Sequence, residues 1–177
     1  ADRLGLSRTS FYGHFSDRND LLDALITQWQ TKNTGNLVKR TEDYAETITE
    51  AILNLFDLWL LPELFDSRLE FAKRNWAHAD PDLTPMLEEA DRVRIEAFTA
   101  MFERFGYEHA SADVRANTMY LTQIGYISIV KDRPSEPLGP RLQRMPHYIE
   151  IFTGKTVSDA EFARFRARHP LGPVKTE

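Results

Sequence analysis

Residues 4–22 hold a short ordered pattern that constrains the fold more than any other part of the chain. A helix ends at Gly5, and Ser7 begins a second, short helix on which Phe11 and Phe15 fall four residues apart and share one face. A short turn containing Gly that sets one helix across another is typical of a helix-turn-helix, whose second helix enters the major groove of DNA. The pattern therefore predicts a DNA-reading module.

The same residues resemble the DNA-binding motif of the tetracycline-repressor (TetR) family of transcription regulators. The usual family pattern is a small residue, Gly, an aliphatic residue and Ser, then a short helix ending Tyr-x-His-Phe. A Ser or Asp and a Lys or Arg then open a long helix with Leu-Leu in its first turn. The matching positions are Gly5, Leu6, Ser7, Tyr12, His14, Phe15, Asp17, Arg18, Leu21 and Leu22. The rest of the chain fits the family in length and helical character.

The resemblance implies which residues contact DNA. The positions of Tyr12 and Arg18 usually grip phosphates, and the region from Arg8 to Ser10 faces bases, where an Arg can bond bidentately to guanine. Thr9, Ser10 and Gly13 differ from the commonest family residues. The expected DNA contacts are Ser7, Arg8, Thr9, Ser10, Tyr12, Gly13, His14 and Arg18. The alternative is a solvated helix-turn-helix used only for packing.

The sequence opens inside the helix that precedes the turn, whereas a TetR-like head has a full helix upstream. Leu4, Phe11 and Phe15 alone make a thin core. We therefore expect this sequence to be an N-terminally trimmed version of a longer protein.

Composition limits the class of protein. The 177 residues are 42% hydrophobic, which supports a sizeable core, and contain no cysteine, which excludes disulfides and thiolate metal sites. Nothing resembles a signal peptide, and no apolar run reaches about 18 residues. We expect a cytoplasmic protein with no membrane partner.

Charge is divided unevenly along the chain. Residues 1–40 carry six basic and four acidic side chains, and the remaining residues carry sixteen basic and twenty-three acidic ones. An acidic balance of −5 overall argues against non-specific coating of nucleic acid. A mildly basic head on an acidic body is compatible with one small DNA-reading module.

Helical periodicity runs nearly throughout, so we predict an all-α, TetR-like fold. It has a partial helix-turn-helix head with its connecting helix over residues 1–40, and a ligand-binding and dimerisation body over residues 41–177. The predicted helices are Asp17 (as N-cap) to about Leu37, 44–61, Pro62 to about Ala77, Thr84 (as N-cap) to about Phe105, 111–131, 145–153 and 158–168. Pro and Gly residues over 132–140 predict a loop.

Aromatic residues on several predicted helices of the body can line a small-molecule pocket, a common site in helical bundles. Gln123 lies between apolar residues, and a buried amide needs partners. It and Asn117 therefore either tie the core together or face a ligand. The candidate ligand-binding residues are Trp59, Phe65, Phe71, Trp76, Phe98, Phe102, Tyr120 and Gln123. For each aromatic residue, simple core packing is the alternative.

Residues 119–130 are apolar nearly all round, so the helix is buried on more than one side. A second subunit can supply the outer cover, and Gly125 and Ser128 allow close helix approach. The predicted dimer contacts are Tyr126, Ile127, Val130, Tyr148 and Phe152. The alternative is the central core helix of a monomer.

Enzymatic chemistry has little support in the sequence. His78-Ala79-Asp80-Pro81-Asp82 is a weak metal-like cluster, and helix capping explains it better. Phosphate-binding glycine motifs and paired carboxylates in an apolar setting are absent. We therefore expect a homodimeric transcription regulator, most often a repressor in this family, with a double-stranded operator and a small effector as partners and no cofactor. A helical protein–protein interaction module is the alternative, and an all-α enzyme is a third possibility.

Overall fold

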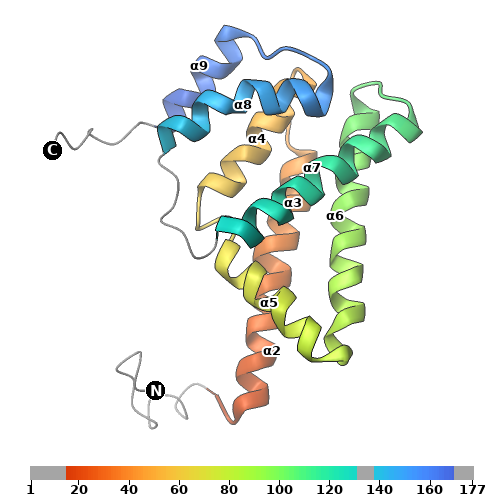
Figure 1. Cartoon of the computed structure of the whole chain (residues 1–177), viewed down its shortest axis with the longest axis vertical. Helices are drawn as coiled ribbons and strands as arrows, with labels where there is room; N and C mark the ends of the chain where they lie inside the picture. Colours follow the sequence, from red (N-terminus) through yellow and green to blue (C-terminus); the bar gives the residue numbers. More distant parts are fainter. Residues whose placement is uncertain (1–14, 131–137, 170–177) are drawn as a thin grey trace, which may run out of the picture.

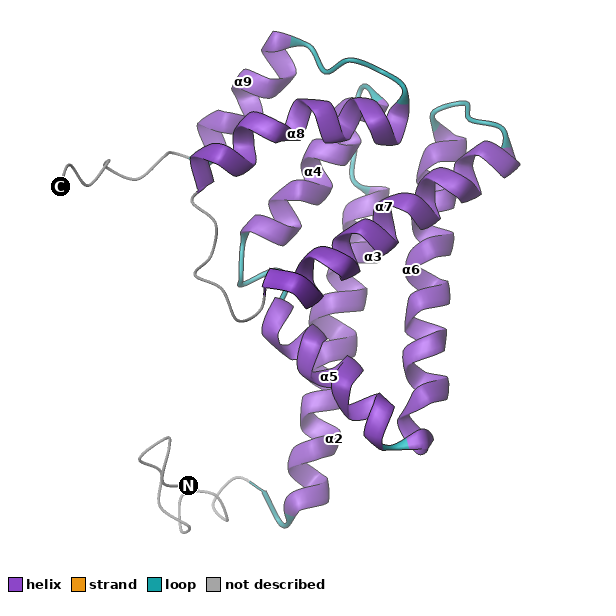
Figure 2. Cartoon of the chain, viewed as in Figure 1, coloured by secondary structure: helices purple, strands orange, loops and turns teal. Residues whose placement is uncertain are grey.

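The computed structural model describes residues 15–130 and 138–169, and every regular element within them is a helix (Figure 2). The predicted all-α class is therefore confirmed for this part of the chain. The predicted DNA contacts Ser7, Arg8, Thr9, Ser10, Tyr12, Gly13 and His14 lie outside the described residues.

A continuous helical rod opens the described chain. Asp17 caps α2 (Arg18–Trp29), as predicted, by accepting hydrogen bonds from two backbone N–H groups of the first turn. The helix then passes through a π-helical segment, η1 (Gln30–Gly35), into α3 (Asn36–Glu42). The backbone stays in the right-handed helical region at both junctions, so the three segments form one rod.

The rod extends beyond its predicted end near Leu37 because tertiary contacts hold its weak middle. Asn33 exchanges two hydrogen bonds with the backbone of Asp66, at 2.9 and 3.0 Å. Asn36 donates to the carbonyl of Leu64 at 2.8 Å, and Leu37 is buried in the core. These polar residues, which weaken an isolated helix, here anchor it. The predicted boundary between head and body, at residue 40, falls inside α3.

Local caps set where the next two helices begin. α4 (Ile48–Leu60) starts after Thr47, whose hydroxyl accepts the backbone N–H of Glu50, and not at residue 44 as predicted. α5 (Ser67–Ala79) starts after Asp66, whose carboxylate accepts the N–H of Leu69 at 2.9 Å, and not at Pro62. Both starts follow the preference for Thr and Asp at the N-cap.

Two long helices follow a short 3-10 segment, η2 (Pro81–Leu83). α6 (Thr84–Arg104) has Leu83 at its N-cap, so Thr84 is the first residue of the helix and not the predicted cap. The Thr84 hydroxyl instead donates to the carbonyl of Ala77. Gly106 has φ +85°, a conformation that favours glycine, and α6 ends there as predicted. α7 (His109–Val130) is the next helix.

α8 (Leu138–Thr153) begins earlier than the predicted residue 145. Pro140 is compatible with this because it lies in the first turn, where a backbone N–H has no partner within the helix. α9 (Asp159–Arg168) starts with a capping box in which Ser158 and Glu161 bond each other's backbone N–H groups.

Helices α3, α4, α6, α7, α8 and α9 bury a common core. Its fully buried members include Leu37, Ile52, Leu55, Phe98, Phe102, Ile149 and Phe165. In Figure 1 the first turns of α2 extend beyond this body, toward the N-terminal end of the chain. No helix in the described ranges is long and apolar enough to cross a membrane.

Candidate functional site: a pocket between α4, α7 and α8

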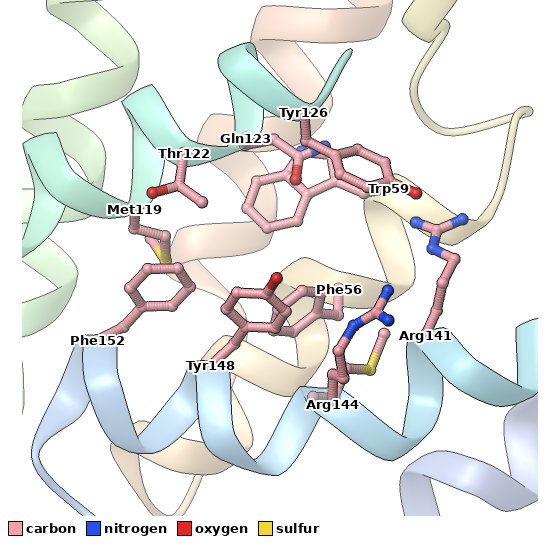
Figure 3. Close-up of a pocket in the computed structure, with 11 residues that line it drawn as sticks. Phe56, Trp59, Met119, Thr122, Gln123, Tyr126, Arg141, Arg144, Tyr148 and Phe152 are labelled. Atoms are coloured by element: carbon pink, nitrogen blue, oxygen red, sulfur yellow. The ribbon is translucent and has the colours of Figure 1, made fainter. Parts of the chain in front are cut away.

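A pocket that encloses about 70 Å³ of free space lies between α4, α7 and α8 (Figure 3). Three helices contribute its lining, which is mostly aromatic and contains two thioethers and two guanidinium groups. The lining residues are Phe56, Trp59, Met119, Thr122, Gln123, Tyr126, Arg141, Arg144, Met145, Tyr148 and Phe152.

Ring contacts set the shape of the pocket. The Phe56 ring meets Trp59 edge-on, with centroids 5.6 Å apart, and the Tyr148 ring stacks on Phe152 at 6.1 Å. The guanidinium of Arg141 lies over the Tyr126 ring, 5.3 Å from its centroid. The indole N–H of Trp59 is buried and has no hydrogen-bond partner among the described residues. A buried N–H without an acceptor is unfavourable, so this group can donate a hydrogen bond to a ligand oxygen.

Two of the eight predicted ligand-binding residues, Trp59 and Gln123, line this pocket. Phe65, Phe98 and Phe102 lie in the core. Tyr120 is also a core residue, and its hydroxyl belongs to a buried polar cluster. Phe71 and Trp76 are half-buried on α5, and Phe71 packs against the core. The side-chain amides of Asn117 and Gln123 lie in different surroundings. Asn117 donates to the backbone carbonyl of Asp113 at 2.9 Å within α7, whereas Gln123 is at the pocket.

The predicted dimer contacts lie partly at the pocket and partly in the core. Tyr126, Tyr148 and Phe152 line the pocket, and Ile127 lies in the core at 6% exposure. The side chain of Val130 lies outside the described part of the structure. The large apolar side chains that are most exposed on α7 and α8 are instead Val114, Leu121, Ile129 and Ile151. We call these four residues the apolar face.

A buried polar cluster joins the rod to the body beside the pocket. Glu70 on α5 and Arg94 on α6 form an ion pair at 2.8 Å with both side chains fully buried. Trp29 of α2 donates its indole N–H to the same carboxylate at 2.7 Å, and Asn33 of η1 donates to it at 3.0 Å. We call this group the Glu70 cluster; its further members are Thr34, Arg74, Asp91 and Tyr120.

The electrostatics of the cluster keep Glu70 ionised. Burial by itself raises the pKa of a carboxyl group, but the Arg94 and Arg74 cations and the hydrogen bonds from Arg94 and Asn33 lower the pKa of Glu70 to about 2. Burial raises the pKa of the Tyr120 hydroxyl, which keeps its proton. The cluster is therefore a network of satisfied charges and donors.

Aromatic rings connect the Glu70 cluster with the pocket. Trp59 meets Phe98 edge-on with centroids 6.4 Å apart, and Phe98 meets Tyr120 at 6.2 Å. The Tyr120 hydroxyl accepts a hydrogen bond from Arg94 at 3.0 Å. A continuous series of contacts thus runs from a pocket residue to the rod.

Lys73 occupies a second aromatic environment, between the rod and α5. Its ammonium lies 4.7 Å from the Trp76 ring centroid and 5.7 Å from that of Trp29, and burial lowers its pKa. Trp76 therefore packs against the Lys73 ammonium on the same helix.

The remaining sequence candidates lie on the surface. Arg18 is exposed at the first residue of α2. Asp80 caps η2 by accepting the N–H of Asp82, which is the capping role considered for that stretch. Within the described ranges, no group of His, Asp and Glu residues is arranged to hold a metal ion.

Comparison of the chain with protein-family models, curated proteins and solved structures found no match. Its function has to be inferred from its own residues and their geometry.

Proposed function

We propose that the chain is a ligand-responsive transcription regulator of the TetR type. It binds a palindromic operator as a homodimer and releases the operator when a small apolar or aromatic effector binds. The observation that carries this proposal is the position of the rod. α2 begins at Arg18, directly after the helix-turn-helix pattern, and its continuation is held inside a body that contains a pocket. We assign repression because it is the commonest role in the family that the pattern resembles.

Effector control follows from the contacts between the pocket and the rod. An effector shifts a conformational balance only by its difference in affinity for the two states. A ligand that moves Trp59 acts through Phe98 and Tyr120 on the Glu70 cluster, which bonds Trp29 and Asn33. The π-helical geometry of η1 at this point supports the assignment, because π-helical segments occur frequently at functional sites.

Dimerisation uses the apolar face in this proposal. Val114 and Leu121 lie two turns apart on α7, and Val114 and Ile151 line one shared groove. A Cβ placed on Gly125 would meet nothing within 4 Å among the described residues, so there is open space at this position of α7. An interface around a two-fold axis is isologous, and it sets two reading helices roughly 34–36 Å apart, one turn of DNA.

DNA binding is the first test. Duplexes selected from a random palindromic pool are titrated with the natural gene product that contains these residues, with scrambled duplexes of equal length as the control. We expect tight, salt-dependent binding to the selected duplex. Arg18→Ala should weaken binding to both duplexes and make the salt slope shallower by about 1, because a phosphate contact carries no sequence information. An unchanged slope would remove the role assigned to Arg18.

The apolar face also favours a second candidate, a helical protein–protein interaction module without DNA binding. Its four side chains, Val114, Leu121, Ile129 and Ile151, are 63%, 62%, 66% and 70% exposed. Exposed apolar surface of this kind marks interaction sites. Absence of salt-dependent binding to any selected duplex would favour this second candidate over the regulator.

A further inference from the structure

We propose that the pocket between α4, α7 and α8 binds an uncharged one-ring aromatic compound through a carbonyl oxygen that accepts the indole N–H of Trp59. This inference rests on the proposed function only in naming the ligand as the effector. The binding site itself is argued from the contacts of the lining residues.

One buried donor in the pocket lacks an acceptor. Of the buried side-chain nitrogen and oxygen atoms in the described ranges, Trp59 Nε1 and Lys73 Nζ are without a hydrogen-bond partner. The Lys73 ammonium lies over two indole rings, which attract its charge. Trp59 is 9% exposed and its N–H has no such compensation. Because buried polar groups in proteins are nearly always bonded, this exception points to a ligand group that completes the site.

The donor chemistry of the pocket selects a carbonyl oxygen. An indole N–H can only donate, so its ligand partner has to accept. A carbonyl oxygen has two lone pairs, and the amide of Gln123, which lines the same pocket, can donate to the second one. Figure 3 shows Trp59 and Gln123 on one side of the pocket and Tyr148 on the other. A carbonyl group directed toward Trp59 and Gln123 therefore leaves the rest of the ligand among aromatic rings.

The two arginines of the lining do not call for a charged ligand. The guanidinium of Arg141 lies over the Tyr126 ring, 5.3 Å from its centroid, and Arg144 already has an interaction partner. A cationic ligand would face two like charges, and an anionic ligand would compete with the partner that Arg144 has. An uncharged ligand disturbs neither arginine and avoids the cost of burying a charge.

The remaining lining residues fix the rest of the ligand. Phe152, Tyr148 and Phe56 present rings, and Met119 contributes a thioether, groups that pack well against an aromatic ring. The free space of about 70 Å³ favours a single ring over a larger skeleton.

Calorimetric titration of the purified chain tests the proposal without DNA. The carbonyl probes are acetophenone and benzamide. 2-Phenylpropene has the shape of acetophenone with a methylene group in place of the oxygen, and benzoate and benzylamine are the charged probes. We expect acetophenone to bind more tightly than 2-phenylpropene by about fivefold or more, because only the ketone accepts the Trp59 N–H. Both charged probes should bind more weakly than acetophenone.

Nuclear magnetic resonance of the indole N–H groups locates the hydrogen bond. The chain has three tryptophans, Trp29, Trp59 and Trp76, and single substitutions to Phe assign their signals. Acetophenone should move the indole proton of Trp59 to lower field than 2-phenylpropene does. The N–H of Trp29, which already donates to Glu70 at 2.7 Å, should respond alike to the two compounds.

Variants assign the preference to the named groups. Trp59→Phe should abolish the difference in affinity between acetophenone and 2-phenylpropene, because Phe keeps a ring and has no N–H. Trp76→Phe is the matched control and should preserve the difference, since Trp76 is not among the described lining residues. Gln123→Leu should reduce the difference without abolishing it. Thermal unfolding checks that each variant is folded, and if Trp59→Phe is not, the resonance difference in the unchanged chain decides.

Four results would overturn the proposal: no saturable binding of acetophenone or benzamide at millimolar concentration, equal or tighter binding of 2-phenylpropene or of a charged probe, a ketone preference that survives Trp59→Phe, or a Trp59 indole signal that responds alike to the two compounds. Failure of the proposed function looks different. In that case acetophenone binds with the expected preference, while the natural gene product shows no operator binding or no change in operator affinity with the ketone.

Discussion

The carboxylate of Glu70 and the guanidinium of Arg94 form an ion pair with no exposed surface on either side chain. The pair joins α5 to α6, and hydrogen bonds from Trp29 and Asn33 bring the rod onto the same carboxylate. Removing one partner of a buried pair leaves an uncompensated charge, which is more costly than replacing both partners. The body and the rod therefore depend on one another at this point.

Glu70→Gln should strongly destabilise the protein. The substitution keeps the size of the side chain but leaves Arg94 and Arg74 facing one another without the shared carboxylate. We expect the free energy of unfolding to fall by about 3–5 kcal/mol, measured by urea denaturation. Glu88→Gln on the exposed surface of α6 is the matched control and should change stability little. A loss in Glu70→Gln no larger than in the control would show that the pair contributes nothing.

The same carboxylate predicts acid sensitivity. The pKa of Glu70 is lowered from 4.5 to about 2 in the folded chain, where the Arg94 and Arg74 cations outweigh the effect of burial. A lowered folded pKa gives stability that is complete above the unfolded pKa and is lost as pH falls from 4.5 toward 2. The loss for this group is about 3 kcal/mol. Glu161, whose pKa is also lowered to about 2 by hydrogen bonds that include Ser158 and Thr47, adds to it.

Unfolding measured at several pH values tests this prediction. The double variant Glu70→Leu/Arg94→Met lacks the first contribution and should lose less stability over the same window than the unchanged chain. Parallel pH profiles for the two proteins would contradict the assignment to Glu70.

Features of the fold that depend on local sequence were predictable, and features that depend on tertiary packing were not. The cap at Asp17 and the end of α6 at Gly106 were predictable because each depends on one residue and its immediate neighbours. The buried pair of Glu70 and Arg94 was not predictable, because each residue lies among other charged residues on its helix. Such a pattern is typical of side chains exposed to solvent. Only the packing of α5 against α6 buries them together.

The candidate site was predictable in part for the same reason. Trp59 and Gln123 stand out as a large ring and a polar residue within apolar stretches, and both line the pocket. The contribution of Arg141 was missed because Pro and Gly residues before it predict a loop, whereas α8 begins at Leu138. Tyr148 and Phe152 were recognised as apolar, but sequence periodicity does not say whether such a face meets its own chain or a second copy.

Trp29→Phe should uncouple the effector from DNA while leaving the pocket intact. The substitution removes the N–H that donates to Glu70 and keeps a ring in the buried position. We expect unchanged effector affinity, measured by calorimetry, and a smaller effect of the effector on operator affinity, measured by fluorescence anisotropy. Trp76→Phe is the control, because Trp76 lies outside the cluster. Because coupling between two sites is reciprocal, operator binding should also change effector affinity less in Trp29→Phe.

The last prediction distinguishes the exposed residues of the apolar face from a buried core residue on α7. Leu121 is 62% exposed and Ile151 is 70% exposed, whereas Ile127 on the same helix as Leu121 is 6% exposed. The hydroxyls of Thr118 and Ser128 on α7 each donate to a carbonyl four residues earlier, so they do not need a partner outside the helix. This side of α7 can therefore pack against a second copy without leaving these hydroxyls unsatisfied.

Leu121→Glu should give a folded monomer, because a charge at the centre of an interface is desolvated without a partner and costs several kcal/mol, about 3–5. Ile127→Glu should instead lower the free energy of unfolding, because the charge enters the core of its own chain. Sedimentation velocity and thermal unfolding together distinguish the two outcomes, with Asp113→Asn on the exposed surface of α7 as the control. If Leu121→Glu remains dimeric, the apolar face is not the dimer surface, and if the unchanged chain is monomeric at micromolar concentration, the homodimer itself is excluded.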